Sequence, residues 1–437
     1  MLSKEWYSVF ICEKNMAKIE NKIKFLDLFA GCGGLSEGFI QAGYEPVAHV
    51  EMDKSACFSL KTRMSYHWLK KHHKLNIYKD YLNNKISREE FYTHIPEKVI
   101  NSVINVEISE STENSIFQKI DNLLGKENLD LIIGGPPCQA YSLIGRASKS
   151  DKMVGDKRNY LFIYYADFIA RYRPKYFVFE NVSGLLSAKD RNGVKYFDMM
   201  KSKFEDLGYT VNTQLLNSFD YGVPQARKRL ILIGSRNDCI TNFPEPDKLD
   251  LPIKINDIFN DLPKLHNGEN YTPFLSKVDA SSFLYKLNIK DDDMPITYHK
   301  ARKNNKQDLE IYKIVVKQWN AKKIRIDYNC LPESLKTHRN RTSFVDRFKV
   351  VAGDLPYSHT VVAHLSKDGH YYIHPDIQQN RSITPREAAR LQTFPDNYFF
   401  ETTSGQLSLA TAFRQIGNAV PVFLAYKIAL KMKGYFS

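Results

Sequence analysis

The chain has 437 residues and a formal net charge of +13 at pH 7, with 43% hydrophobic and 25% charged residues. This composition is typical of a globular protein of one or two domains and excludes a disordered chain. No apolar run reaches the roughly 18 residues of a membrane span, no export signal begins the chain, and six scattered cysteines without a CxxC pair argue against a disulfide framework. We therefore expect a basic, cytoplasmic protein with no membrane partner.

Residues 1–20 are expected to form an N-terminal extension, and residues 21–238 contain repeated strand–loop–helix units. The strands are predicted from short apolar runs, which are KIKFLDLF, EPVAHVEMD, LDLIIGG, PKYFVFEN and RLILIG. Helical spacing between these runs predicts an α/β fold with a doubly wound, mostly parallel sheet. A basic stretch at 61–105 interrupts the pattern, and we expect it to be helical, with no assigned function.

Regularity is lost between residues 239 and 380, where prolines and loop residues predict a second, smaller and irregular domain. Within it, residues 300–349 hold 14 Lys or Arg against 5 Asp or Glu. Such an excess indicates either a solvated helical surface or a face that follows nucleic-acid phosphates. The helical pattern returns at 381–437, where Thr384 and Glu387 have the spacing of a capping box.

A glycine-rich turn follows the first predicted strand, in the segment DLFAGCGGLSEGF at residues 27–39. Its glycines allow a tight turn and a close approach of a ligand. Ser36 stands where the dinucleotide fingerprint GxGxxG requires its third glycine, so that motif is not matched. Glu51, at the end of the next predicted strand, could accept both ribose hydroxyls of an adenosine cofactor. Taken alone, these residues fit a cofactor site and a structural turn equally well.

Cys138 lies on a loop that follows the strand in LDLIIGGPPCQAYS, residues 129–142. The two prolines restrict the backbone just before the thiol, which suits a nucleophile held in one place. Basic residues nearby would favour the reactive thiolate. Most single cysteines are inert and buried, but this local context favours a catalytic role.

Charged residues also mark two further predicted strands. Glu180 ends PKYFVFEN at the carboxyl edge of the sheet, where it could exchange a proton with a ligand or only cap the next turn. In YGVPQARKRLILIG, Gln225, Arg227 and Arg229 alternate, so they would project from one face if the strand begins there. Two guanidiniums could then hold a carbonyl or phosphate, although a solvated edge strand is the commoner explanation.

Four histidines raise the question of a metal site. They lack the spacing of a zinc site and have no cysteine nearby, so we expect strand and loop positions for them and no metal. They are His359, His364, His370 and His374.

Taken in order, these segments resemble the cytosine-5 DNA methyltransferases of prokaryotic restriction-modification systems. The matching blocks span residues 25–425 and are DLFAGCGGLSEGF, VEMD, GGPPCQAYS, FENV, QARKR, TPREAARLQTFPD and FRQIGNAVP. The resemblance implies a Rossmann-like catalytic domain at 21–238 that binds S-adenosylmethionine, and a target-recognition domain at 239–380. It further implies that the C-terminal helices at 381–437 return to the catalytic domain.

The resemblance implies a sequence-specific enzyme that methylates C5 of a flipped cytosine. It assigns Cys138 as the nucleophile at C6, Glu180 and Arg229 as contacts to the cytosine ring, and Arg227 with Gln225 as residues that organise the pocket. Glu107 is the local candidate for an acid that contacts adenine, since the family's Gly-Asp after the third strand is absent here. The remaining cofactor contacts are Phe29, Ala30, Gly31, Gly33, Gly34, Glu51, Met52, Gly135, Pro137 and Asn418.

The implied partner is double-stranded DNA, bound by a monomer that is functionally paired with a restriction endonuclease without a stable complex. Two alternatives stay open: the same chemistry on transfer RNA, and a catalytically silent DNA-binding subunit. The basic zone favours duplex DNA, and the intact set of Cys138, Glu180 and Arg229 argues against a silent subunit. A nicotinamide oxidoreductase is disfavoured by Ser36 and by the PPC loop.

Overall fold

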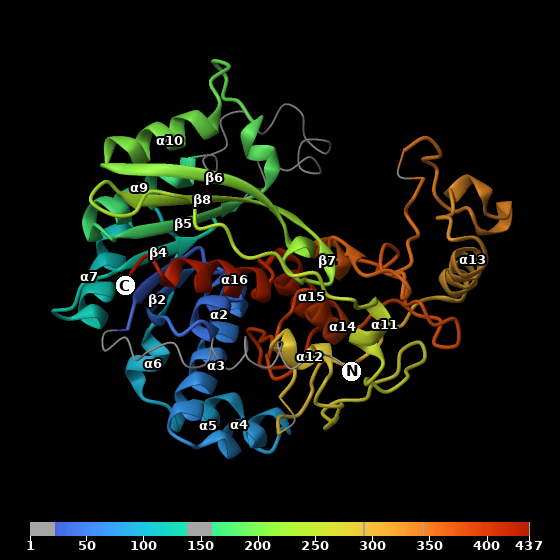
Figure 1. The fold of residues 1–437 in the computed structure, drawn as a ribbon. Coiled ribbons are helices and arrows are strands. Elements are labelled where there is room, and N and C mark those ends of the chain that lie inside the picture. The colour runs from blue at the N-terminus through green and yellow to red at the C-terminus, as the bar shows by residue number, and fades with distance from the viewer. Residues whose placement is uncertain (1–21, 138–159, 292, 344, 437) are drawn as a thin grey trace.

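A seven-stranded sheet forms the centre of the computed structural model, which describes residues 22–137, 160–291, 293–343 and 345–436 (Figure 1). The strand order is β3–β2–β1–β4–β5–β8–β6. Neighbouring strands are parallel, except that β8 runs antiparallel to β5 and to β6. The strands are β1 (Lys24–Leu28), β2 (Glu45–Glu51), β3 (Val103–Asn105), β4 (Leu131–Gly134), β5 (Tyr176–Asn181), β6 (Tyr209–Asn217) and β8 (Lys228–Arg236).

Helices cover both faces of this sheet, because successive side chains of a strand point to opposite faces. Ile133 and Val178 pack into the cluster that contains α2, α14, α15 and α16, whereas Ile132 and Phe177 pack into the cluster of α7, α9 and α10. This arrangement confirms the doubly wound, mostly parallel α/β fold. The covering helices are α2 (Gly34–Gln41), α7 (Glu113–Leu124), α9 (Leu161–Tyr172), α10 (Tyr196–Asp206), α14 (Pro385–Leu391), α15 (Leu409–Asn418) and α16 (Val422–Lys433).

All five apolar runs contain the strands predicted for them, whereas β3 and β6 were not predicted from the pattern. β3 has only three residues, too few to produce a recognisable run. β6, with the sequence YTVNTQLLN, lies at the edge of the sheet and leaves Leu215 45% exposed. A strand that is half exposed does not need the continuous apolar sequence of a central strand.

Four helices occupy the chain between β2 and β3, which confirms the helical prediction for this stretch. We call them the helical insertion, and they are α3 (Lys54–Lys71), α4 (Leu75–Leu82), α5 (Arg88–Thr93) and α6 (Glu97–Asn101). Asp53 begins α3 by accepting a hydrogen bond from the backbone N–H of Ala56 at 2.9 Å. The insertion has its own hydrophobic cluster, which includes Tyr78 and Phe91. Figure 1 shows α4 and α5 at the end of the molecule opposite β6.

The C-terminal segment returns to the sheet, where α16 packs against α2 (Figure 1). The predicted capping box is confirmed at the start of α14. The Thr384 side chain accepts from the backbone N–H of Glu387, and the Glu387 carboxylate accepts from the backbone N–H of Thr384 at 2.7 Å. The contact of α16 with α2 therefore packs residues near the end of the chain against the first βα unit.

Regular structure is sparse between β8 and α14. It consists of α11 (Ile255–Phe259), α12 (Phe283–Lys286), α13 (Lys306–Lys322) and β9 (Ser358–His359), which pairs with β7 (Gln225–Ala226), a short strand that precedes β8. Short 3-10 turns complete this region at Tyr328–Cys330, Glu333–Leu335 and Ala363–Ser366, and two others precede β8 at Ser183–Leu186 and Ser218–Asp220. Ile255 and Leu284 pack into the same cluster as α2 and α16, so part of this region shares the core of the sheet.

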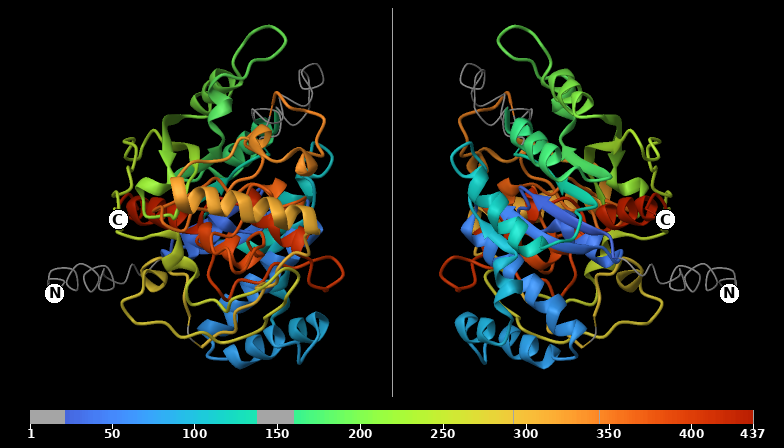
Figure 2. Two further views of the ribbon diagram at one scale, coloured as in Figure 1. Left: turned by 90° about the vertical axis from the view of Figure 1, so that its right-hand side faces the viewer. Right: turned by 90° about the vertical axis from the view of Figure 1, so that its left-hand side faces the viewer.

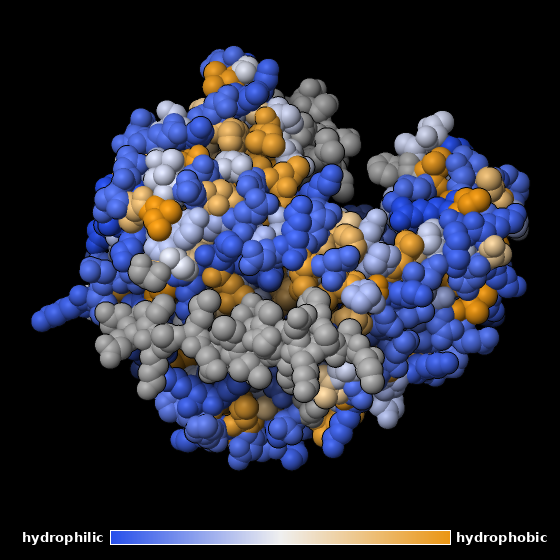
Figure 3. Space-filling model, in the orientation of Figure 1, coloured by the Kyte–Doolittle hydropathy of each residue, from blue (hydrophilic) through white to orange (hydrophobic). Residues whose placement is uncertain are grey.

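Residues 305–350, which we call the α13 lobe, pack around a separate hydrophobic cluster that includes Trp319, Tyr328 and Phe348. The indole N–H of Trp319 donates to Asp354 Oδ1 at 2.8 Å. α13 runs along the outside of the molecule (Figure 2), and the surface is indented between this lobe and the part that contains the sheet (Figure 3). Among the described residues, no helix combines the length and apolar character needed to cross a membrane.

Candidate active site

A cavity of about 1570 Å³ opens at the carboxyl ends of β1, β2, β3, β4 and β5. It spans the point between β1 and β4 where the strand order reverses, which is where open α/β sheets bind ligands. Twelve of the residues expected from the sequence line it. They are Phe29, Ala30, Gly31, Gly34, Glu51, Met52, Glu107, Gly135, Pro137, Glu180, Arg229 and Asn418.

The glycine-rich turn after β1 forms one wall of the cavity. Gly31 and Gly33 have φ angles of 56° and 87°, in the left-handed region that favours glycine. A Cβ on Gly34 would lie 2.5 Å from the carbonyl oxygen of Val420, so the turn packs directly against the C-terminal segment. Gly33 is not among the lining residues; a Cβ there would lie 2.7 Å from Leu60. Gly33 therefore shapes the turn from behind.

Glu51 is fixed at the end of β2 by two backbone amides. Its Oε2 accepts from the N–H of Gly31 at 2.8 Å, and its Oε1 accepts from the N–H of Asp53 at 2.7 Å. Burial raises the pKa of Glu51 above its ordinary value, although these hydrogen bonds oppose the shift. Next to it, Met52 is 61% exposed and presents an apolar side chain to the cavity.

Glu180 and Arg229 form an ion pair at the opposite side of the cavity. Arg229 Nε lies 2.6 Å from Glu180 Oε1, and each side chain is only 13% exposed. The pair is positioned by the antiparallel pairing of β5 with β8. A Cβ on Gly135 would lie 2.7 Å from Glu180 Oε2, so a larger residue in the loop after β4 would displace the Glu180 carboxylate. The amide of Asn181 donates to the carbonyl oxygen of Pro136 at 3.4 Å and links the same two strand ends.

Gln225 and Arg227 both bind Val361, whereas Arg229 pairs with Glu180, and the strand is interrupted at Arg227 between β7 and β8. Arg227 is 1% exposed, and its guanidinium donates to the carbonyl oxygens of Val361 at 2.6 Å and Gly417 at 3.2 Å. Gln225 is likewise buried. Of the three, only Arg229 lines the cavity, and the condition for a shared face, one strand through all three residues, is not met. Arg227 instead joins the end of β7 to segments that follow the α13 lobe.

The described residues stop at Pro137 and resume at Tyr160, so Cys138 lies outside them. Glu107 is exposed at the rim of the cavity, and Asn418 ends α15 there. The four histidines occupy strand, turn and loop positions, as expected. Within the described part of the chain, no three His, Cys, Asp or Glu side chains are grouped so that they could hold a metal ion.

Sequence reasoning missed several lining residues, among them Asp27, Tyr164, Arg414 and Gln415. Asp27 is 1% exposed, and burial raises its pKa well above the ordinary range. A charged residue inside the apolar run KFLDL is the signal that could have singled it out. Arg414 and Gln415 lie in the FRQIGNAVP block beside Asn418, but nothing in the spacing shows which side of α15 faces the cavity.

Comparisons with known proteins agree with this architecture. The family model described as C-5 cytosine-specific DNA methylase matches residues 23–91 and 78–434. Type II methyltransferase M.Bpa9945I of Bacillus paralicheniformis is 40% identical, covering 93% of this chain and 98% of the relative. Type II methyltransferase M.DdeI of Desulfomicrobium norvegicum is 29% identical, covering 95% and 89%. The crystal structure of a candidate DNA modification methyltransferase from an E. coli prophage superposes with a TM-score of 0.62 at 20% identity, covering 95% and 99%, which shows a shared fold.

Proposed function

This chain belongs to the family of C-5 cytosine-specific DNA methylases, and we propose that it methylates specific cytosines of double-stranded DNA through a covalent bond to Cys138. The observation that carries this proposal is the Glu180–Arg229 pair, which lines the same cavity as Glu51 and the glycine-rich turn. The enzymes of this family and fold depend on S-adenosylmethionine, so the two sides of the cavity suit a methyl donor and a base.

The residues that line the cavity fit the methyl donor. The space next to Gly31 is open, Met52 supplies an apolar contact, and Glu51 keeps a carboxylate that can accept ribose hydroxyls. Ligand pockets commonly measure about 300–1,000 Å³. A cavity of about 1570 Å³ therefore leaves room for a flipped base beside the cofactor.

Cytosine C5 is too weak a nucleophile to attack a methyl sulfonium directly. We propose that the Cys138 thiolate forms a bond to C6 while Glu180 passes a proton to N3, which converts the ring into an enamine. Arg229, already held beside Glu180, is placed to donate to the carbonyl oxygen O2. Since C6 is shielded inside a duplex, the base must first leave the stack.

Bound beside the glycine-rich turn, Glu51 and Met52, S-adenosylmethionine would supply an electrophilic methyl group, with S-adenosylhomocysteine as the leaving group. The enamine C5 takes the methyl group, a base removes the C5 proton, and the C6–S bond breaks so that its electrons return to the Cys138 sulfur. Proton transfer from N3 back to Glu180 restores the enzyme. No further oxidant or reductant is needed.

We propose that the basic α13 lobe, within the region 239–380, recognises the DNA target. Lys313, Lys317 and Arg339 are exposed there, and the indentation in Figure 3 separates the lobe from the part that contains the sheet. Phosphate contacts would position the duplex, and a few side chains would read base edges. Exchanging residues 300–349 for the matching zone of a relative should change the methylated sequence; an unchanged sequence would refute this assignment.

The decisive experiment combines labelled S-adenosylmethionine with unmethylated duplex DNA or transfer RNA, and uses Cys138→Ala as control. We expect label in DNA only with the intact cysteine, and sequencing for 5-methylcytosine would identify the target. Label in RNA alone would favour a transfer-RNA enzyme. Absence of label in both would favour a silent DNA-binding subunit.

We further propose that the enzyme acts as a cytoplasmic monomer and protects host DNA from a separate restriction endonuclease. The Type II names of its relatives support this role. Sedimentation of the purified protein tests the monomer. Absence of an endonuclease gene beside this one would count against the protective role.

A further inference from the structure

A closed ring of hydrogen bonds joins α3 of the helical insertion to α15 and to the segment between α14 and α15. The hydroxyl of Ser59 donates to Gln415 Oε1 at 2.7 Å and accepts from the backbone N–H of Glu401 at 2.8 Å. Gln415 Nε2 closes the ring by donating to the carbonyl oxygen of Glu401 at 2.8 Å. All three residues are buried, with at most 7% exposure, so water cannot replace these bonds.

The ring reaches the cofactor side of the cavity through Gln415. This residue lines the cavity, and its carbonyl oxygen accepts a hydrogen bond from the Cys32 thiol at 3.5 Å. Cys32 belongs to the glycine-rich turn, and its own carbonyl oxygen accepts from the Tyr398 hydroxyl. The orientation of Gln415 is thus coupled to the turn that surrounds Gly31.

The helical insertion also holds Glu401 from the other side. The Glu401 carboxylate accepts from the hydroxyls of Thr62 at 2.7 Å and Tyr81 at 2.5 Å. Arg88 lies 3.4 Å from this carboxylate and donates to the carbonyl oxygen of Thr402 at 2.5 Å. Three helices of the insertion, α3, α4 and α5, therefore fix the backbone to which the Gln415 amide is bound.

We propose that Gln415 is a positioning residue of the cofactor site, and that the helical insertion sets its position through Ser59 and Glu401. This inference rests on the proposed binding of S-adenosylmethionine in the cavity. It gives the insertion, far from the α13 lobe in the fold, a role in the affinity for the cofactor. Ser59 itself does not line the cavity, so its effect on the cofactor must pass through the ring.

The test compares Ser59→Ala with Ser65→Ala in the full-length protein. Both serines are buried in α3, and each hydroxyl also contacts the backbone carbonyl four residues earlier, at Ser55 and Lys61. Only Ser59 reaches Gln415. We expect the Kd for S-adenosylhomocysteine, measured by calorimetry, to rise about tenfold in Ser59→Ala, as for the loss of one or two buried hydrogen bonds. We expect it to stay within about twofold in Ser65→Ala.

Equal Kd values in the two variants would overturn the proposal. In a double-mutant cycle, Ser59→Ala should have little further effect in a Gln415→Ala background, whereas additive effects would show that the two residues act independently. If Ser59→Ala does not fold, Ser59→Cys keeps a side chain of similar size with only a weak donor and should show the same direction of change. Failure of the wild type to bind S-adenosylhomocysteine would instead refute the proposed function.

Discussion

The contact between the helical insertion and the C-terminal segment differs from the α13 lobe in the environment of its charges. Arg63 of α3 lies 2.6 Å from Glu37, with side chains 4% and 1% exposed, and also donates to Asn397 at 2.8 Å. In the α13 lobe, by contrast, Lys313 and Lys317 are exposed and have no ion-pair partner among the described residues. Both regions are rich in charge, but the Arg63–Glu37 pair is enclosed, whereas Lys313 and Lys317 face solvent.

The difference separates two uses of charge in one molecule. A buried charge without a partner is costly, so Glu37 and Arg63 must be paired and serve the structure. Exposed lysines contribute little to folding and remain free to neutralise the phosphates of a polyanion. The net charge of +13 therefore does not locate a nucleic-acid surface by itself. We expect such a surface where exposed cationic side chains have no ion-pair partner.

The Glu180–Arg229 pair gives the strongest test of the distinction between structural and functional charge. It is mostly buried, like Glu37–Arg63, yet it lines the cavity. We expect Glu180→Gln to slow methyl transfer about 10²–10⁴-fold, since the amide cannot pass a proton to N3 as Glu180 does in the proposed mechanism. Single-turnover transfer of label from S-adenosylmethionine to DNA measures the change. A variant within about threefold of wild type would show that the pair is structural, like Glu37–Arg63.

Breaking the enclosed pair should cost stability. We expect Arg63→Met to lower the free energy of unfolding by about 3–5 kcal/mol in urea, because it leaves Glu37 buried without its cation. Lys85→Met provides the control, since Lys85 and Asp80 form a 2.9 Å pair with side chains 66% and 44% exposed. We expect a change of at most about 1 kcal/mol there. Equal losses would remove the distinction between enclosed and exposed charge.

The same pair determines the sign of a pH effect. Burial alone would raise the pKa of Glu37, but Arg63 and His67 lower it overall, well below the ordinary range. The stabilisation is therefore present above the ordinary glutamate pKa of about 4.3 and is lost only as the pH falls through the lower pKa of the folded state. The urea measurements of Arg63→Met and Lys85→Met are therefore to be made near neutral pH, where this stabilisation is fully present.

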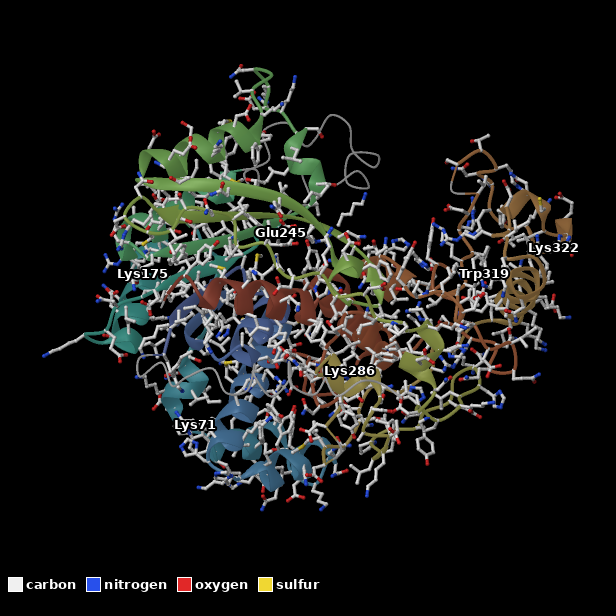
Figure 4. The ribbon with its side chains drawn as sticks, viewed as in Figure 1. Lys71, Lys175, Glu245, Lys286, Trp319 and Lys322 are labelled. Carbon is white, nitrogen blue, oxygen red and sulfur yellow. The ribbon has the colours of Figure 1, made fainter. Side chains whose placement is uncertain are left out.

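Neutralising an exposed charge of the α13 lobe should affect DNA binding and leave folding unchanged. Arg339 is exposed in the part of the lobe that follows α13, whereas Figure 4 shows Lys322 on the side that faces away from the sheet. We expect Arg339→Gln to weaken DNA binding by up to about tenfold and to reduce the salt slope by about one. Lys322→Gln should have less effect. Identical salt slopes in both variants would argue against DNA in the indentation.

The smallest expected effect concerns Glu51, which is half-buried and in the proposed role accepts ribose hydroxyls as a charged carboxylate. Because burial raises its pKa, the side chain takes up a proton at a higher pH than an exposed glutamate. We expect the affinity for S-adenosylhomocysteine to fall a few-fold as the pH is lowered towards about 5. In Glu51→Gln the affinity should be weaker and independent of pH in this range. A wild type without pH dependence would contradict the proposed role.

Much of the fold and the site could be predicted from the sequence because the relevant signals are local. Apolar runs such as LDLIIGG form central strands in any doubly wound sheet, and the Thr384–Glu387 spacing specifies a helix start by itself. Glu51, Glu180 and the glycine-rich turn follow their strands directly, so their meeting at one sheet edge could be inferred. The edge strand β6 escaped prediction because its burial is only partial.

The sequence by itself determined the parallel sheet, the order of the strand-end residues and the family to which the chain belongs. Only the tertiary structure decided that Arg227 turns into the interior while Arg229 reaches Glu180, and that Ser59 meets Gln415 across 356 positions of the chain. The physical reason is that strand and helix periodicity constrain neighbouring residues, whereas the partner of a buried polar group is selected by packing between distant segments.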